Sequence, residues 1–440
     1  MTQGVQQHYQ PARAWWAVFL LFAASILSVI DRGILSIVVD AVKADIGLSD
    51  VQISLLQGLA FGIFYAVVGV WLGLIADRMS RRNLIVGGIA LWSIATAASG
   101  FVHSFGAMFA CRLLVGLGEA ALAPAAISLI ADLFPPAKRG RAIGIYLMGQ
   151  SVATGISFFA AGSLLHIAGA GGFASVPVLA GLAPWRTIFL LCGLAGIVIV
   201  LGYLTVREPA RVSNVATALP GQGHMQAIAG YYRAHWRLLV CIYGGFALFF
   251  LGSYAGLAWQ IVMLSRRFAM EAATVAVMLS PVSLVFGILG PLVGGMLVDA
   301  AVKRTGETGI LSILRFVPLL GLIFCFANGA TSQWAGIVLV GTLGGVAAIV
   351  GTATLAWLQA TMPGDMRGIA VSGTGLVNTI VGATMGPLLV ALITDKLFVD
   401  PSKIGLAMTY VAAPAFILSA LLYMTGHRIA RRDDRLSGQA

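Results

Sequence analysis

Long apolar segments alternate with short polar ones along almost the whole chain. Each apolar segment approaches or exceeds the roughly 20 residues that a helix needs to cross a bilayer. The segments of spanning length are 14–39, 51–76, 83–102, 106–133, 142–165, 186–206, 238–264, 274–298, 310–327, 334–360, 368–394 and 404–425. This pattern predicts an all-α membrane protein with twelve transmembrane helices.

Composition agrees with a multi-pass integral membrane protein. Hydrophobic residues make up 59% of the 440 residues and charged residues only 10%, which excludes an ordinary soluble domain. The net charge of +11 lies in short loops between apolar segments, so we expect membrane lipids rather than nucleic acid as partners. The four cysteines have no metal-ligand or disulfide spacing. We expect a monomer without metal or cofactor.

The distribution of Lys and Arg predicts the orientation. Eighteen of the 27 basic residues lie on the side of both termini, six lie on the opposite side and three lie inside spans. Because cytoplasmic loops carry an excess of Lys and Arg, both termini should be cytoplasmic.

A polar interval near the midpoint, residues 207–236, predicts a cytoplasmic linker between two six-helix halves, 1–206 and 237–440. The halves share short motifs. Asp77 in GLIADRMSRR and Asp299 in GMLVDAAVKR are 222 residues apart, and Arg139 and Arg367 in two Pro-rich loops are 228 apart. Nearly equal offsets indicate a duplicated unit, and transporters built this way bind substrate between the repeats near the midplane.

The motif GLIADRMSRR resembles the loop 2–3 signature of the major facilitator superfamily. The resemblance implies two pseudo-symmetric bundles in the major facilitator fold, and a latch that closes the cytoplasmic side. The latch residues it implies are Gly73, Asp77, Arg78, Arg81, Arg82 and Arg139. For Arg81 and Arg82 taken alone, ordinary anchoring at the membrane surface is an equal alternative.

The sequence RLLVGLGEA (112–120), together with Asp31-Arg32 in the first span, resembles the bacterial spinster family more narrowly. This resemblance implies a transporter of lysophospholipids or sphingoid lipids in a bacterial inner membrane. Proton-linked anion:cation symporters have similar first and fourth spans, so a proton-coupled organic anion symporter remains the alternative. A membrane-embedded enzyme is not expected, because no nucleophile–base or metal-ligand arrangement occurs within the spans.

Charged residues inside the spans predict a proton-coupling site, because intramembrane ionisable groups usually mark a transport path. Arg112 and Glu119 are seven residues apart and share one helix face about 10 Å apart along the axis. The depth of Asp31 falls between them. Our hypothesis is that Asp31 and Glu119 compete for Arg112 and that protons are the coupling ion; the alternative is a static ion network. Arg32 points about 100° away from Asp31, to line the cavity or to pair locally.

The second half has no charged residue away from its span ends. Neutral polar and aromatic candidates for the substrate cavity are Tyr146, Gln150, Tyr254, Trp259, Gln260, Thr374 and Asn378. For each of them, hydrogen bonding between helices is the plainer alternative. A cavity with one charged wall and one neutral wall suits an amphiphile with a polar head and an alkyl tail.

Overall fold

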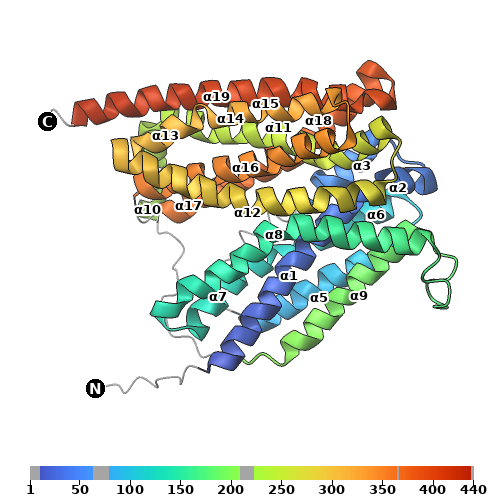
Figure 1. The fold of residues 1–440 in the computed structure, drawn as a ribbon. Helices are drawn as coiled ribbons and strands as arrows, with labels where there is room; N and C mark the ends of the chain where they lie inside the picture. Colours follow the sequence, from blue (N-terminus) through green and yellow to red (C-terminus); the bar gives the residue numbers. More distant parts are fainter. Residues whose placement is uncertain (1–9, 63–78, 209–221, 364–365, 438–440) are drawn as a thin grey trace.

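The computed structural model describes residues 10–62, 79–208, 222–363 and 366–437. Within these ranges the regular structure is entirely helical. Figure 1 shows two bundles of long helices, one with α1 and α5 to α9, the other with α11 to α19. The start of α1 and the end of α19 lie at the same end of the molecule, here called the terminal end (Figure 1).

The first bundle is built from apolar helices with recognisable start signals. Pro lies in the first turn of α1, α8 and α9, where its missing N–H costs nothing. Ser49 caps α3 in a capping box with Gln52. The helices are α1 (Pro11–Ile37), α2 (Val39–Ile46), α3 (Asp50–Gln57), α5 (Arg81–Ser99), α6 (Phe105–Ala120), α7 (Leu122–Leu133), α8 (Pro136–Gly169) and α9 (Pro184–Leu204).

The second bundle follows α10 (Gln222–Ala234), a helix inside the segment that we predicted as a linker. Its early elements are α11 (Trp236–Phe268), α12 (Ala272–Thr305), α13 (Thr308–Leu314), α14 (Val317–Leu320), α15 (Leu322–Cys325), η1 (Phe326–Gly329) and α16 (Gln333–Thr361). Its later elements are α17 (Arg367–Val377), η2 (Asn378–Met385), α18 (Gly386–Leu392), η3 (Ile393–Phe398), η4 (Pro401–Lys403) and α19 (Ile404–Ser437). Both η2 and η3 are π-helical, a distortion frequent at functional sites.

Ten helical stretches of the described chain are long and apolar enough to cross a membrane. Part of the predicted segment 51–76 lies outside the described residues. The predicted segment 83–102 forms α5. This helix of 19 residues is not among the ten, because the arginines at its first two positions lower its mean hydropathy. Large apolar side chains such as Val198 and Met296 are 67% and 70% exposed, which is typical of a lipid-facing surface.

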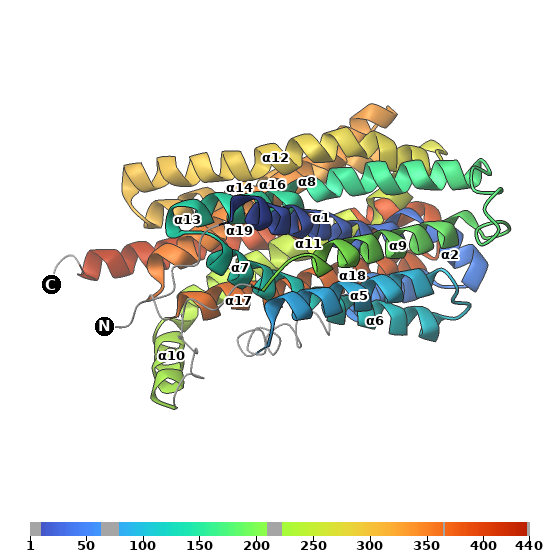
Figure 2. The same cartoon turned by 90° about the horizontal axis from the view of Figure 1, so that it is seen from below.

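The two bundles meet opposite the terminal end. A Cβ at Gly162 on α8 would lie 2.9 Å from the Ala273 carbonyl oxygen at the start of α12, and one at Gly58 would lie 2.4 Å from the Ala383 carbonyl oxygen. A Cβ at Gly144, near the other end of α8, would have no neighbour within 4 Å. The ribbons of α1 and α19 diverge toward the left of Figure 1, and the view from below shows α10 projecting away from the long helices (Figure 2).

Candidate functional site

Three of the four predicted proton-coupling residues are buried side by side on α1 and α6. Asp31, Arg112 and Glu119 are 0%, 1% and 3% exposed. Nη1 of Arg112 donates a hydrogen bond of 3.0 Å to the backbone carbonyl of Asp31, not to its carboxylate. Neither carboxylate oxygen of Asp31 has a hydrogen-bond partner among the described residues. The predicted proximity of these groups is therefore present in the fold.

The partner of Glu119 differs from our hypothesis. Its Oε2 lies 3.1 Å from Nε of Arg32 and accepts a hydrogen bond of 2.6 Å from Ser28 Oγ. Arg32 Nη2 donates to the same Ser28 hydroxyl at 2.8 Å. Among the described residues, Arg112 forms an ion pair with neither Asp31 nor Glu119, so the structure does not contain the ion pairs that our hypothesis requires. The reason is that residues 28 and 32 are one helical turn apart, so both side chains of α1 reach Glu119 together.

Arg32 pairs locally, which is one of the two roles that the sequence left open, and it is not among the residues that line the two cavities described below. Its side chain is 38% exposed although it forms the ion pair with Glu119. Its guanidinium carbon lies 5.3 Å from the centre of the Phe61 ring, a cation–π distance. Arg32 is therefore the charged group of this cluster that a ligand can reach. Ser28 was not predicted, although its place four residues before Arg32 is the signal that would have identified it.

A cavity of about 230 Å³ lies between α8 and the second bundle. Thr154, Gln260 and Ser283 contribute its polar side chains, and the remaining walls are apolar or glycine. Gly287 and Pro291 of α12 also line it. Pro291 has no N–H to donate to the Gly287 carbonyl, which leaves that oxygen without its normal helical partner. The cavity therefore offers neutral hydrogen-bonding groups on an apolar surface, and the predicted candidate Gln260 is one of them.

Other predicted cavity residues use their polar groups within the protein. Trp259 is 0% exposed, and its Nε1 donates to the Pro387 carbonyl at 3.2 Å. Thr374 donates to the Val371 carbonyl of its own helix at 2.7 Å. Tyr146 is 1% exposed in the core of the first bundle. These contacts are typical of helix packing.

Three further candidates lie at more open positions. Nδ2 of Asn378 lies 3.4 Å from the Tyr254 hydroxyl, at the start of the π-helical element η2. Phe250 packs beside Tyr254 with ring centres 6.3 Å apart. Gln150 is exposed on α8. Tyr254 and Asn378 therefore form a polar pair on the second bundle.

The described part of the predicted latch is a buried charge cluster around Arg81, which is 2% exposed. Arg81 forms ion pairs with Asp132 of α7 and with Glu208, whose Oε1 lies 3.0 Å from Arg81 Nε. Glu208 also accepts hydrogen bonds from the Arg82 backbone N–H at 2.7 Å and from the Ser80 hydroxyl at 2.9 Å. It therefore caps the N-terminus of α5. Neither acidic partner was predicted.

Ion pairing and capping lower the pKa of Glu208. Partial burial raises its pKa, but the Arg82 backbone N–H and the Arg81 and Ser80 side chains together bring the pKa below its ordinary value. The ionised form of Glu208 therefore stabilises the folded state.

The other predicted latch residues either lie outside the described residues or bind backbone carbonyl groups. Gly73, Asp77 and Arg78 lie outside the described residues. Arg82 donates to the Leu204 carbonyl at 2.5 Å, and Arg139 donates to the Phe134 carbonyl at 2.9 Å. The equivalent of Arg139 in the second half, Arg367, donates to the Met362 carbonyl at 3.1 Å. Both bonds reach five residues back, so the repeated motif also repeats in structure.

Replacing Glu208 by glutamine should destabilise the protein at neutral pH by about 1 kcal/mol, the usual cost of a lost helix cap at a partly exposed position. Because the folded-state pKa is lowered, the contribution is present above the unfolded pKa of about 4.3 and is lost as pH falls through the folded pKa. Thermal unfolding of both proteins at several pH values measures this. A difference in melting temperature that persists unchanged at acid pH would contradict the assignment.

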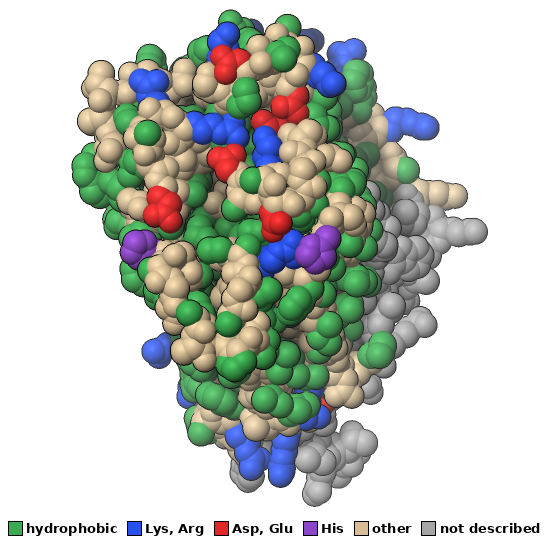
Figure 3. All heavy atoms as spheres, turned by 90° about the vertical axis from the view of Figure 1, so that its right-hand side faces the viewer, with side chains coloured by type: hydrophobic (Ala, Val, Ile, Leu, Met, Phe, Trp, Pro, Cys, Tyr) green, Lys and Arg blue, Asp and Glu red, His purple; other side chains and the backbone are tan. Residues whose placement is uncertain are grey.

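Charged residues gather at the end where the bundles meet (Figure 3). Arg266 of α11 forms an ion pair of 2.7 Å with Asp40 of α2, and Asp395 of η3 accepts a hydrogen bond of 3.2 Å from the Val51 backbone N–H. Both contacts join one bundle to the other. Within the first bundle, Arg186 hydrogen-bonds to Asp45 at 3.0 Å and lowers the pKa of that carboxyl. The end opposite the terminal end is therefore closed by ionic contacts.

Comparison with known proteins agrees with this architecture. An "MFS-type efflux pump" of Mycolicibacterium smegmatis is 25% identical, over 96% of this chain and 95% of that protein. A "Probable L-galactonate transporter" of Escherichia coli is 26% identical, over 86% and 83%. The crystal structure of a bacterial homolog to the human lysosomal transporter Spinster, inward-facing and unoccupied, has a TM-score of 0.75 at 22% identity, covering 95% of this chain and 96% of that one.

The profile of the Major Facilitator Superfamily matches residues 21–387, most of the chain. Members of this family are membrane transporters rather than enzymes. The chain is therefore a member of the Major Facilitator Superfamily, with the spinster-type fold among its structural neighbours.

Proposed function

We propose that the protein is a proton-linked secondary active transporter of an amphiphilic lipid, of lysophospholipid or sphingoid type. It works as a monomer with twelve transmembrane helices in a bacterial inner membrane, with both termini in the cytoplasm. The halves 1–206 and 237–440, joined by the linker 207–236, rock against each other about the cavity of about 230 Å³ between α8 and the second bundle, called the central cavity from here on. In this orientation the end closed by the contacts of Arg266 with Asp40 and of Asp395 with Val51 faces away from the cytoplasm.

The observation that carries the lipid proposal is the asymmetry of the central region. The charged groups Asp31, Arg32 and Glu119 all belong to the first bundle. The cavity against the second bundle is mostly apolar, with the neutral groups of Gln260 and Ser283. A polar head at Arg32 and an alkyl tail along the apolar wall use both surfaces.

Proton coupling is proposed to act through the pair of Glu119 and Arg32. Protonation of Glu119 removes its charge and weakens the ion pair, so that the partly exposed guanidinium of Arg32 can interact more strongly with an anionic head group. Asp31, fully buried with the Thr96 hydroxyl beside it, is a second place where a proton removes the cost of a buried anion. Proton and substrate would then bind together, as in a symporter.

A second candidate function is proton-coupled symport of a small organic anion. The observation that favours it is the same arginine, because a guanidinium binds a carboxylate as well as a phosphate. The relatedness to a probable L-galactonate transporter supports it too. No charged side chain among the described residues of either bundle lines the central cavity of about 230 Å³, which favours an amphiphile over a small charged anion.

Transport in liposomes under an imposed pH gradient decides between the two. The purified protein is reconstituted, and the fluxes of a lysophospholipid, a phosphorylated sphingoid base and a sugar acid are compared with and without the gradient. We expect gradient-dependent movement of the lipids and none of the sugar acid. Movement of the sugar acid alone would establish the second function, and flux independent of pH would refute proton coupling.

A further inference from the structure

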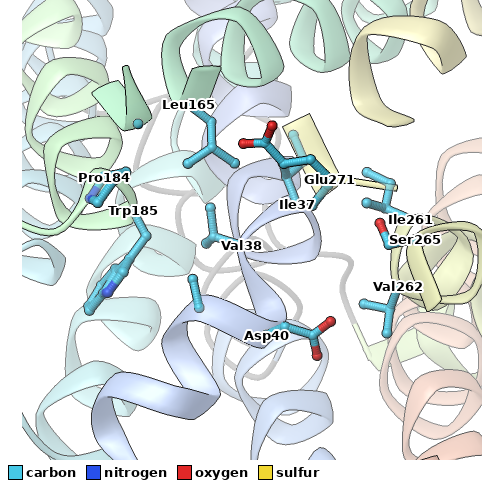
Figure 4. A pocket seen from close by; sticks show the side chains of 13 residues that line it. Ile37, Val38, Asp40, Leu165, Pro184, Trp185, Ile261, Val262, Ser265 and Glu271 are labelled. Atoms are coloured by element: carbon cyan, nitrogen blue, oxygen red, sulfur yellow. The ribbon is translucent and has the colours of Figure 1, made fainter. Parts of the chain in front are cut away.

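A second cavity, of about 240 Å³, lies at the closed outer end and is separate from the central one. Figure 4 shows Val38, Leu165 and Trp185 of the first bundle on one side and Ile261 and Val262 of α11 on the other. Most of its lining is hydrocarbon. The outer cavity therefore has the apolar body that is usual for a small-molecule site.

Two carboxylates lie at opposite edges of this outer cavity, Asp40 and Glu271 (Figure 4). Asp40 is neutralised by Arg266 at 2.7 Å. Glu271 is exposed at the N-cap position of α12, where its side chain caps no backbone N–H. No salt bridge between described residues includes Glu271. The cavity therefore carries one uncompensated negative charge at its rim.

We propose that the outer cavity binds a small hydrophobic ammonium ion. The ammonium group donates a charge-assisted hydrogen bond to Glu271, and the hydrocarbon part packs against Val38, Leu165 and Ile261. An anion is disfavoured by the free carboxylate. A hydrated metal ion is disfavoured because the walls are mostly apolar and the second carboxylate, Asp40, already pairs with an arginine.

Occupation of the outer cavity has a conformational consequence. Its walls come from both bundles, since α8 and α9 face α11 and α12 across it. Opening this end would separate the two walls and divide the site. A ligand that binds only the intact cavity stabilises the closed outer end by its binding free energy. The site is therefore a regulatory one, beyond the transported substrate.

The test uses phenylbutylammonium and, as its anionic counterpart of similar shape, phenylpentanoate. Binding of each to the full-length protein in lipid nanodiscs is measured by calorimetry, which requires no transport activity. We expect the ammonium ion to bind at least about tenfold more tightly than the carboxylate. Equal binding of the two probes, or no binding of the ammonium ion, overturns the proposal.

Two variants locate the bound probe. Glu271→Gln should weaken binding of the ammonium ion about fivefold to tenfold and should not weaken binding of the carboxylate, because the substitution removes a charge that attracts the first probe and repels the second. The matched control is Glu307→Gln, an exposed glutamate at the start of α13 far along the chain, which should change neither. Ala272→Phe, at the wall of the cavity, should fill it and prevent binding. Unchanged affinity in Glu271→Gln places the probe elsewhere and refutes the site.

Discussion

Replacing Asp31 by asparagine should abolish transport driven by a pH gradient while exchange of substrate across the membrane persists. Asp31 is fully buried, and neither carboxylate oxygen has a hydrogen-bond partner among the described residues. A carboxylate in this position is costly as an anion, and a bound proton removes that cost. Asparagine keeps the shape and holds the side chain neutral permanently. Gradient-driven flux in liposomes should fall by at least about tenfold, the effect of losing about 1.4 kcal/mol of coupling.

The companion variant Glu119→Gln should also lose gradient-driven flux, but for a different reason. It removes the negative partner of Arg32, which then stays available for the substrate whether or not a proton is bound. Substrate exchange without a gradient shows in each variant that the protein is folded and able to change conformation. Asp400→Asn, the same chemical change in an outer turn, is the matched control and should behave as the wild type. Normal gradient-driven flux in both Asp31→Asn and Glu119→Gln would refute proton coupling at this site.

Replacing Gly88 by valine should destabilise the first bundle by about 3 kcal/mol, the upper part of the usual range for overpacking. A Cβ at Gly88 of α5 would lie 2.7 Å from the Gly118 carbonyl oxygen of α6, and a Cβ at Gly118 would lie 2.6 Å from the Gly88 carbonyl oxygen. The obstacle in each case is backbone, which cannot turn aside as a side chain can. The two helices would have to separate, as expected where small residues allow close approach in a membrane.

The adjacent glycine supplies the control. A Cβ at Gly87 would meet no atom within 4 Å, so Gly87→Val introduces the same side chain into the same helix without the clash. The lower helix propensity of a β-branched residue applies to both variants and cancels in the comparison. Thermal unfolding in detergent measures the difference. Equal melting temperatures for Gly88→Val and Gly87→Val would show that the contact between α5 and α6 does not limit stability.

The glycine contact also bears on the charged site. Gly118 precedes Glu119 directly in α6, so the contact with α5 sets how that helix is placed against its neighbours. Loss of the contact should therefore disturb the ion pair of Glu119 and Arg32. The contact between α5 and α6 should therefore affect both the stability of the first bundle and proton coupling.

Much of the charged site was predictable from spacing alone. Arg112 and Glu119 share a face of one helix by their seven-residue separation, and their depth matches that of Asp31 by the rise per residue. Which acid pairs with which arginine was not predictable. The helical period fixes the direction of the Cα–Cβ bond, but it does not fix where the guanidinium at the end of a long side chain lies. Arg32 was treated as uncertain and proved to be the partner of Glu119 at 3.1 Å.

Two other features required the fold. Asp132 and Glu208 lie 76 residues apart in sequence and meet only because α7 and the end of α9 both reach the start of α5, where Arg81 binds both. The helix α10 lies in a stretch with too little apolar sequence to predict a membrane span. The apolar residues of α10 recur with a helical period, but this pattern is recognisable only when the ends of the helix are known.

The sequence by itself determined where apolar helices form and which side of the membrane its basic loops favour. Both are local properties, since a bilayer requires an unbroken apolar helix and the charge bias lies in short loops. Only the tertiary structure decided which end of the two bundles is closed, which acid pairs with which arginine, and where cavities remain. Those outcomes depend on how closely helices approach at small residues and how far side chains reach between segments distant in the chain.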